Sequence, residues 1–355
     1  MNRIDAFRTE AGLKACEGAY ITKPSNVFYL TGFTGEGILA VTGTEAALVT
    51  DFRYTEQAGQ QAPGIPVKTI RRGAGHAVLA WEVMRSAGAD TVLFEDDHVT
   101  VQDFEKLKAD MPGAEFRPLN GIPERMRTVK DAEETGLIRK ACAISCEAFA
   151  DLLSFAKAGM TEKQVQLHLD YTMLSLGADG LAFNTIAAAG DHGSLPHAIP
   201  SDRVIREGEM LTLDFGARFG GYDADMTRTV SFGEPGAEMR RIYETVLQAH
   251  LECEQMLRPG VCCRDVDAHA RSVIDGAGYQ GRFGHSLGHG VGIDIHELPR
   301  LSMTGDTVLK PGHIVTVEPG IYVPGLGGVR IEDTCVITED GFQSLVPAPK
   351  DLLIL

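Results

Sequence analysis

Short apolar runs alternate with polar turns through the first 119 residues, a pattern typical of a small α/β domain. We predict strands in four runs rich in β-branched and aromatic residues: NVFYLTGF, GILAVTG, AALVTDFRYTEQA and ADTVLFEDD. TVQDFEKLKADM begins with an N-capping threonine and predicts a helix. A polar stretch that contains glycine and proline, LNGIPERMRTVKDAEE, then predicts a domain boundary, which we place between residues 122 and 123.

The remaining chain, residues 123–355, contains an internal duplication. After a long helix predicted from Asp131 to Lys157, SDRVIREGEMLTLDFG (201–216) matches GDTVLKPGHIVTVEPG (305–320) at a constant offset of 104 residues. Upstream, residues 157–180 match residues 258–281, so each unit predicts two helices, a loop and a hairpin. Two units are too few for a solenoid, and we therefore predict two pseudo-symmetric halves that share a sheet core covered by helices.

Each duplicated apolar strand ends in an acidic residue, and each return strand carries another. MLTLDFG supplies Asp214 and IVTVEPG supplies Glu318, while the return strands carry Asp225 and Glu332. Apolar and polar residues alternate poorly in the first two strands, so we expect both of their faces to be buried. Opposite residues of a hairpin lie about 5 Å apart, so two facing hairpins would present four carboxylates to one point.

Four buried carboxylates remain ionised only where cations compensate their charge. Oxygen-rich ligation with one or two imidazoles suits manganese, cobalt, iron or zinc. Two such ions, roughly 3.5–4 Å apart and bridged by carboxylates, generate a hydroxide at neutral pH. A single acid at a strand end usually caps a solvated turn, but four at duplicated positions predict a paired metal site.

Histidines are concentrated in the segment RFGHSLGHGVGIDIHELPRL, which contains His285, His289 and His296. Glycines on both sides of His289 permit the backbone to approach a site closely. Each unit also carries a His-x-x-Pro sequence, which begins at His197 in the first and at His296 in the second. These histidines are candidates for ligation and substrate contact, whereas the competing interpretation is a set of ordinary polar loop residues.

An alternative enzyme class is suggested by Gly284–Gly288, which matches the Gly-x-Ser-x-Gly nucleophile elbow of serine hydrolases around Ser286. That motif requires a buried strand before the serine and a helix after it. The flanking segments, GAGYQGRF and HGVGIDIHELP, predict neither element. We therefore interpret Ser286 as a loop residue and keep a serine hydrolase as an alternative function.

Composition restricts the remaining function classes. The formal net charge is −16, from 33 basic and 49 acidic residues, which argues against binding a phosphate backbone. No apolar run approaches the roughly 20 residues that span a bilayer, and MNRIDAFRTE lacks the apolar region of a secretory signal. Seven scattered cysteines without a Cys-x-x-Cys pair are typical of reduced thiols. We expect a cytoplasmic protein that binds neither nucleic acid nor membrane.

Together, several segments resemble the Xaa-Pro peptidases, the prolidases and proline aminopeptidases of the pita-bread metallopeptidase family M24: LDFGARFGGYDADMTRTV, PHAIPSDR, GHSLGHGVGIDIHELP, VEPGIYVPGLGGVRIED and NVFYLTGF. The resemblance covers nearly the whole chain. It implies an α+β fold, with a small creatinase-like α/β domain at residues 1–122 and a pita-bread catalytic domain of two pseudo-two-fold halves at residues 123–355. It also implies a homodimer.

The resemblance implies five metal ligands, all of which are present. Asp214 matches a ligand of one ion, and Asp225 and Glu332 match ligands that bridge two ions. His289 and Glu318 match ligands of the other ion, and Glu318 is implied to shuttle the proton of a bridging water. The implied cofactors are two divalent metal ions, with manganese favoured over cobalt, zinc or iron.

Further residues match positions that surround the metals in the family. His197, His285 and His296 match histidines around the substrate, and His296 is implied to stabilise charge at the scissile carbonyl. Thr227 and Arg330 match residues that support the ligand carboxylates, and Arg330 also matches the substrate-binding region. Such supports usually influence metal affinity.

The implied reaction is hydrolysis of the bond before proline, by attack of a metal-bridging hydroxide, in small peptides with proline at the second position. Arg300 matches a position at which some prolidases bind the substrate's terminal carboxylate, which favours a dipeptidase over an aminopeptidase. Some relatives are metal-free binding proteins or creatine-hydrolysing enzymes, but the five ligands are all present here. Methionine aminopeptidases share those ligands and usually lack the N-terminal domain.

Overall fold

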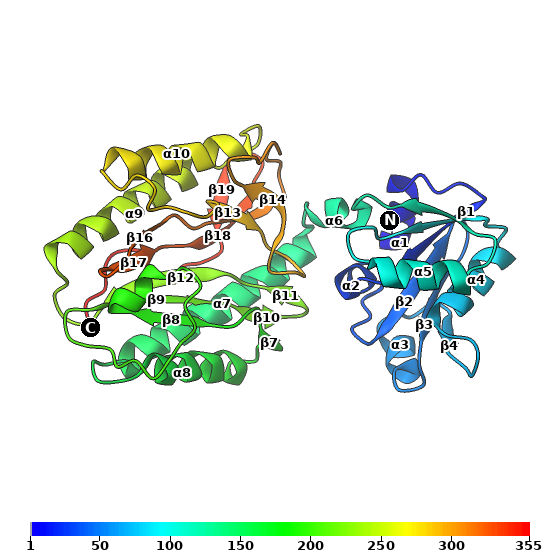
Figure 1. The fold of residues 1–355 in the computed structure, drawn as a ribbon, viewed down its shortest axis with the longest axis horizontal. Coiled ribbons are helices and arrows are strands. Elements are labelled where there is room, and N and C mark those ends of the chain that lie inside the picture. The colour runs from blue at the N-terminus through cyan, green and yellow to red at the C-terminus, as the bar shows by residue number, and fades with distance from the viewer. Residues whose placement is uncertain (1) are drawn as a thin grey trace. The chain divides into compact units, whose positions relative to one another are not determined.

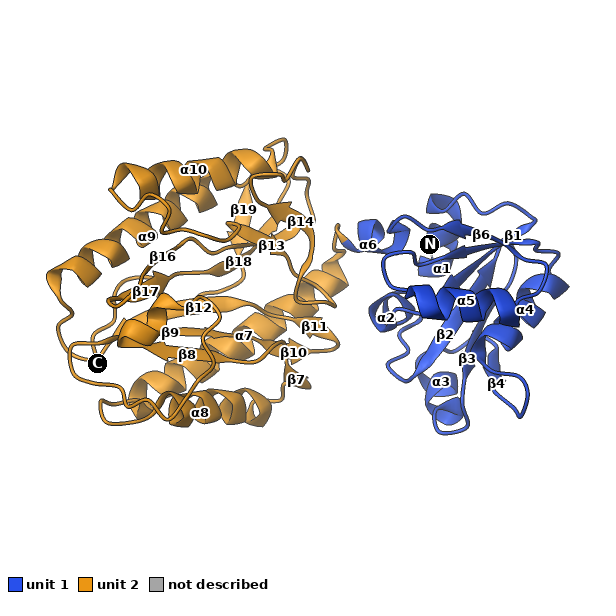
Figure 2. Cartoon of the chain, viewed as in Figure 1, with its two compact units in different colours: residues 1–127 blue, residues 128–355 orange. Residues whose placement is uncertain are grey.

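The computed structural model describes residues 2–355 and divides into two compact units, Met1–Arg127 and Thr128–Leu355 (Figure 2). The boundary expected at 122/123 falls at the start of helix α6 (Ile122–Arg127). Within residues 2–355, no helix is both long enough and apolar enough to cross a membrane.

The first unit is built on a mixed six-stranded sheet in the order β4-β3-β2-β1-β5-β6. Its central strand, β1, pairs antiparallel with β2 and parallel with β5. Helices α4 and α5 pack against this sheet through a buried apolar cluster (Figure 1). The strands are β1 (Glu17–Ile21), β2 (Gly37–Thr42), β3 (Ala46–Thr50), β4 (Val67–Thr69), β5 (Thr91–Phe94) and β6 (Glu115–Pro118). The helices of this unit before α6 are α1 (Arg3–Glu10), α2 (Pro24–Thr31), α3 (Thr55–Gln61), α4 (His76–Ser86) and α5 (Val101–Asp110).

One predicted strand in this unit is wrong, because NVFYLTGF forms most of helix α2. Pro24 occupies the first turn of the helix, and Gly32 ends it with φ +77°, a left-handed conformation that suits glycine. Periodicity alone does not distinguish a short apolar helix from a strand. The strand predicted over AALVTDFRYTEQA ends at Thr50, and its second part forms α3. The strands predicted at GILAVTG and ADTVLFEDD are confirmed, as is the helix capped by Thr100.

The second unit has the two predicted halves, each with a pair of helices followed by strands (Figure 1). The long helix expected from Asp131 is α7, and Asp131 and Glu134 form a capping box at its start. The helices are α7 (Ala132–Phe155), α8 (Glu162–Ser175), α9 (Ala237–Met256) and α10 (Cys263–Gly276).

The strands of each half form their own main sheet, β12-β9-β8 in the first and β14-β13-β15-β18-β19 in the second. In the first half they are β7 (Gly180–Leu181), β8 (Ile186–Ala189), β9 (Met210–Phe215), β10 (Ala217–Phe219), β11 (Tyr222–Asp223) and β12 (Met226–Ser231). In the second half they are β13 (Gly288–Gly290), β14 (Glu297–Leu301), β15 (Ile314–Val317), β16 (Gly320–Val323), β17 (Gly327–Arg330), β18 (Asp333–Ile337) and β19 (Phe342–Ser344).

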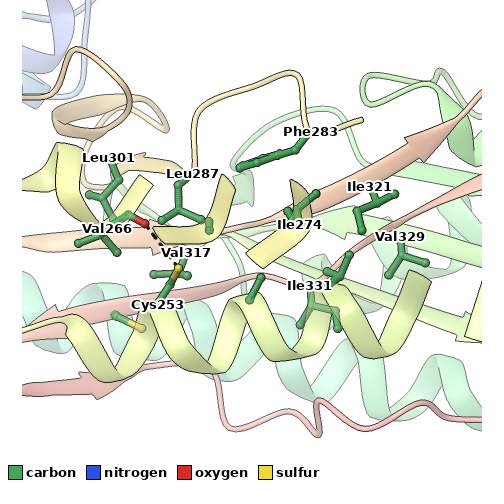
Figure 3. Packing of buried hydrophobic residues seen from close by; sticks show 14 of the residues in the cluster. Cys253, Val266, Ile274, Phe283, Leu287, Leu301, Val317, Ile321, Val329 and Ile331 are labelled. Carbon is green, nitrogen blue, oxygen red and sulfur yellow. Dashed lines mark hydrogen bonds between the residues drawn. The ribbon is translucent and has the colours of Figure 1, made fainter. Parts of the chain in front are cut away.

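Helices α9 and α10 pack against the strands of the second half through a large buried cluster (Figure 3). Val317 and Ile331, which are fully buried in this cluster, each adjoin one of the predicted acidic ligands in the sequence. Successive side chains of an extended segment point to opposite faces, so anchoring these two residues in the core directs Glu318 and Glu332 away from it. Core packing therefore fixes the direction in which the side chains of Glu318 and Glu332 project.

Candidate metal centre

The first hairpin places Asp214 and Asp225 at one end of paired strands β9 and β12. Thr227 lies opposite Asp214, and Met226 lies opposite Phe215. Asp225 immediately precedes β12 and so lies just beyond the ladder, rather than directly opposite Asp214. Both acids nevertheless line the same cavity.

The second hairpin repeats this arrangement with β15 and β18. Val317 pairs with Asp333 at the end of the ladder, and Glu318 and Glu332 lie directly beyond that pair. The two hairpins meet where the amide of Glu332 donates to the carbonyl of Thr227 at 3.0 Å. Thr227 Oγ1 also donates to Glu332 Oε2 at 2.7 Å. This junction brings the acids of the two halves together.

His289 lies on β13, and its orientation is fixed by backbone contacts. Its Nδ1–H donates to the carbonyl of Gly290 at 3.1 Å. The lone pair of Nε2 therefore faces Asp225 Oδ2 at 3.5 Å and Glu318 Oε1 at 3.3 Å. A Cβ at Gly288 would lie 2.0 Å from the carbonyl oxygen of Thr316, so glycine beside His289 permits the close approach of β15.

A cavity of about 350 Å³ is lined by all the predicted catalytic, metal-ligating and substrate-binding residues, while Thr227 lies outside the lining and contacts Glu332. The exposed members of its lining are His197, Ser286, His296 and Arg300. Arg300 lies opposite His289 in the β13–β14 ladder, which puts the two side chains on one face. The ten predicted residues in the lining are His197, Asp214, Asp225, His285, His289, His296, Arg300, Glu318, Arg330 and Glu332.

Burial dominates the electrostatics of three acids in the cavity: Asp225, Glu318 and Glu332. Burial and repulsion from neighbouring carboxylates raise the pKa values of Asp225 and Glu332 well above their ordinary values. Burial also raises the pKa of Glu318 to about 8, although Arg330 opposes the rise. Among residues 2–355, Arg330 is the one arginine or lysine that forms an ion pair with any of the four acids, at 2.6 Å from Asp214 Oδ2.

These residues fit divalent metal ions. Two carboxylate oxygens, Asp214 Oδ1 and Glu332 Oε1, are buried without a hydrogen-bond partner in the described structure, although each needs a donor or a cation. Ligand atoms of Asp225, His289 and Glu332 lie within 4.8 Å of one another. Burial, reinforced by His296, lowers the pKa of His289 to about 4, which leaves the neutral imidazole that a metal requires.

Tyr322 is a further site residue that the sequence analysis missed. Arg330 NH1 donates to the Tyr322 hydroxyl at 2.8 Å, and that hydroxyl lies 2.8 Å from His285 Nε2. His285 Nδ1–H donates to the carbonyl of Ser286, so Nε2 accepts the hydrogen of Tyr322. The position equivalent to Tyr322 in the first half is Arg218, and the duplication therefore gave no signal for it.

The surroundings of Ser286 do not form a nucleophile elbow. Residues 282–284 form no strand, and β13 rather than a helix follows the serine. Both ring nitrogens of the adjacent His285 are engaged elsewhere, by the Ser286 carbonyl and by Tyr322. In the described part of the chain, no histidine is hydrogen-bonded to the Ser286 hydroxyl, and the serine lacks an activating base.

Two family models match the chain in sequence order. The Creatinase/Prolidase N-terminal domain matches residues 3–129, and metallopeptidase family M24 matches residues 136–339. The Xaa-Pro dipeptidase of Pyrococcus furiosus is 37% identical over 336 residues, which cover 94% of each chain.

Solved structures with the same fold carry two kinds of description. An Xaa-Pro dipeptidase from Bacillus anthracis superposes with a TM-score of 0.95 at 38% identity, covering 99% of each chain. An X-Pro aminopeptidase from Thermotoga maritima superposes with a TM-score of 0.91 at 34% identity, covering 98% of this chain and 100% of that one. Sequence and structure agree over almost the full length, and the chain belongs to metallopeptidase family M24.

Proposed function

We propose that this protein is a metal-dependent exopeptidase that hydrolyses the bond before proline in small peptides. The observation that carries the proposal is the group of four carboxylates and a neutral imidazole around one cavity. Within the described residues, Arg330 is the one arginine or lysine that forms an ion pair with any of these four acids. One guanidinium does not balance four ionised carboxylates, so the group needs divalent cations to compensate the remaining negative charge. The Xaa-Pro peptidases to which the chain is similar supply the substrate class.

The residues that would hold two divalent ions are Asp214, Asp225, His289, Glu318 and Glu332. Bound divalent ions would supply positive charge for the developing oxyanion and a water that ionises near neutral pH. We favour manganese because the donor set is mostly carboxylate oxygen. Thr227 and Arg330 hold Glu332 and Asp214 in place through the hydrogen bonds described above.

Several side chains of the cavity have proposed roles in the peptide-bond chemistry. Glu318 accepts a proton from the attacking water and returns it to the proline nitrogen as the C–N bond breaks. His296 and His197 reach the open part of the cavity, where an N–H of either can donate to the scissile carbonyl oxygen. His285 is held as a neutral acceptor by Tyr322, and burial with the charge of Arg330 lowers its pKa to about 4.

Arg300 is the proposed anchor for the substrate's terminal carboxylate, and it favours dipeptides. Replacing Arg300 by alanine should lower kcat/KM for an Xaa-Pro dipeptide by about 10- to 100-fold, because a charge-assisted hydrogen bond is lost. An Xaa-Pro-Yaa tripeptide places its carboxylate elsewhere and should lose much less. Steady-state kinetics on both peptides measure the difference.

The control is Arg264→Ala, since Arg264 is exposed on α10 away from the cavity lining. That variant should cleave both peptides as the unsubstituted protein does. Equal losses for dipeptide and tripeptide in Arg300→Ala would contradict the assignment of Arg300 and remove the preference for a dipeptidase.

We also propose a cytoplasmic location and a homodimer. All seven cysteines are free thiols, four of them buried, which is consistent with a reducing compartment. The dimer is supported by the family resemblance, and light scattering at several protein concentrations tests it. A mass equal to one chain at micromolar concentration would contradict the dimer.

A further inference from the structure

A second group of ionisable side chains lies behind the metal centre. Asp333 follows the proposed ligand Glu332 directly, so the two side chains point to opposite faces of the extended chain. Asp333 Oδ1 lies 2.8 Å from Arg228 NH2, and Asp333 Oδ2 lies 2.7 Å from Lys350 Nζ. Lys350 also lies 3.2 Å from Glu254. We define the rear ion cluster as Arg228, His250, Glu254, Asp333 and Lys350.

The rear ion cluster differs from the metal centre in its charge balance. Its two carboxylates, Glu254 and Asp333, face two permanent cations, Arg228 and Lys350. Burial acts to raise the pKa of Glu254, but His250 and Lys350 outweigh it and lower that pKa to about 2. His250 Nε2 lies 3.4 Å from Glu254 Oε1. The two permanent cations therefore balance the two carboxylates, and the cluster does not share the cation deficit of the metal centre.

Two members of the cluster bind the main chain at the metal ligands. His250 Nδ1–H donates to the carbonyl of Val317 at 3.0 Å, the residue immediately before Glu318. Arg228 NH1 donates to the carbonyl of Glu332 at 2.6 Å and to that of Thr227 at 2.9 Å. The peptide groups from which the proposed ligands Glu318 and Glu332 project are therefore held from behind.

The C-terminal segment completes the cluster. Arg228 Nε and NH2 donate to the carbonyls of Pro349 and Ala348, both at 2.8 Å. Tyr243 Oη donates to the carbonyl of Lys350 at 2.8 Å. These bonds hold the partly exposed Lys350 side chain against Asp333, whereas Arg228 and Asp333 are almost fully buried. The segment after β19 thus delivers one of the two cations.

We propose that the rear ion cluster positions Glu318 and Glu332 and thereby sets the affinity of the site for metal, an inference that rests on the proposed metal centre. Without Lys350, the two buried carboxylates Asp333 and Glu254 face only one permanent cation, Arg228. An uncompensated buried charge is strongly unfavourable, and the structure shifts to rehydrate it. Asp333 is covalently next to Glu332 and pairs with Val317 in the ladder, so such a shift moves both ligands. Arg228, His250 and Lys350 are positioning residues in this account.

The test is the affinity of the purified full-length protein for Mn²⁺, measured by isothermal titration calorimetry on metal-stripped samples. Lys350→Met should weaken Mn²⁺ binding by roughly 10- to 100-fold, the range typical of residues that orient metal ligands. Lys140→Met is the matched control, because Lys140 is exposed on α7, and its affinity should equal that of the unsubstituted protein.

A neutralising double variant separates charge balance from a loss of packing. Glu254→Gln with Lys350→Met removes one anion and one cation, and it should recover most of the lost affinity. The double variant also serves if Lys350→Met does not fold alone. A lower Tm with unchanged Mn²⁺ affinity in Lys350→Met, or a double variant with affinity as weak as the single one, would overturn the proposal. Absence of Mn²⁺ binding by the unsubstituted protein would instead contradict the metal centre itself.

Discussion

Replacing Glu318 by glutamine should reduce kcat for an Xaa-Pro peptide on the order of 10²- to 10⁴-fold, the range expected when a proton-transferring group is lost. Glutamine keeps the shape of the side chain and its contact with Thr316 Oγ1, which lies 3.3 Å from Glu318 Oε1. It removes the charge that faces His289 and the group that accepts the proton of water. Steady-state kinetics at saturating Mn²⁺ give the ratio.

The fold should survive this substitution, since Glu318→Gln relieves repulsion among buried acids rather than creating a cavity. Circular dichroism checks this point. Glu339→Gln is the control, because Glu339 is exposed in the turn between β18 and β19, and it should retain full activity. Activity of Glu318→Gln within a factor of ten of the unsubstituted protein would contradict the proposed role of Glu318.

Removal of metal should destabilise the protein, and more so at pH 8 than at pH 5.5. In the metal-free protein, burial raises the pKa of Glu318 from 4.5 to about 8. Its contribution to the free energy of unfolding is fully present below about pH 4.5 and is lost as the pH rises towards 8. Asp225 and Glu332 shift in the same direction. Bound cations compensate the ionised carboxylates and so restore the free energy of unfolding that is lost at high pH.

Thermal unfolding of metal-stripped protein, with and without Mn²⁺, measures the effect. The same Mn²⁺ concentration, 100 times the dissociation constant measured at pH 5.5, is used at both pH values. At pH 5.5 it adds about 2.7 kcal/mol, which corresponds to a rise in Tm of roughly 5–10 °C for a unit of this size. The rise should be larger at pH 8 than at pH 5.5, and Glu318→Gln should reduce that difference. A rise in Tm that is independent of pH would show that these carboxylates are not the groups that bind metal.

The sequence predicted the acids of the proposed metal centre because they occupy corresponding places in the two duplicated units. Asp214 and Glu318 occupy equivalent positions at the ends of two apolar strands. The repeat therefore predicts a buried group of carboxylates that needs cations to compensate its negative charge. The structure brings both into one cavity. His289 came from the family resemblance, and its position in the structure is explained by the glycines beside it: Gly288 permits the approach of Thr316, and Gly290 permits that of Leu298.

Residues without a repeat were harder to predict. The position equivalent to Tyr322 in the first half is an arginine, and the contact of Tyr322 with His285 joins segments 37 residues apart. Arg228 and Lys350 meet at Asp333 from separate parts of the chain, so no local pattern indicates the rear ion cluster. NVFYLTGF was misassigned for a different reason: its apolar residues suit either a strand or a buried helix, and Pro24 with Gly32 decides in favour of the helix.

The central claim is that the clustered carboxylates hold the metals that hydrolyse a bond before proline. The most direct measurement is hydrolysis of an Xaa-Pro dipeptide and an Xaa-Pro-Yaa tripeptide by metal-stripped protein, before and after addition of Mn²⁺ or Co²⁺. We expect no cleavage without metal and cleavage with it, faster for the dipeptide. Metal-independent cleavage that is abolished by stoichiometric labelling of Ser286, or no cleavage of either peptide under any metal condition, would contradict the claim.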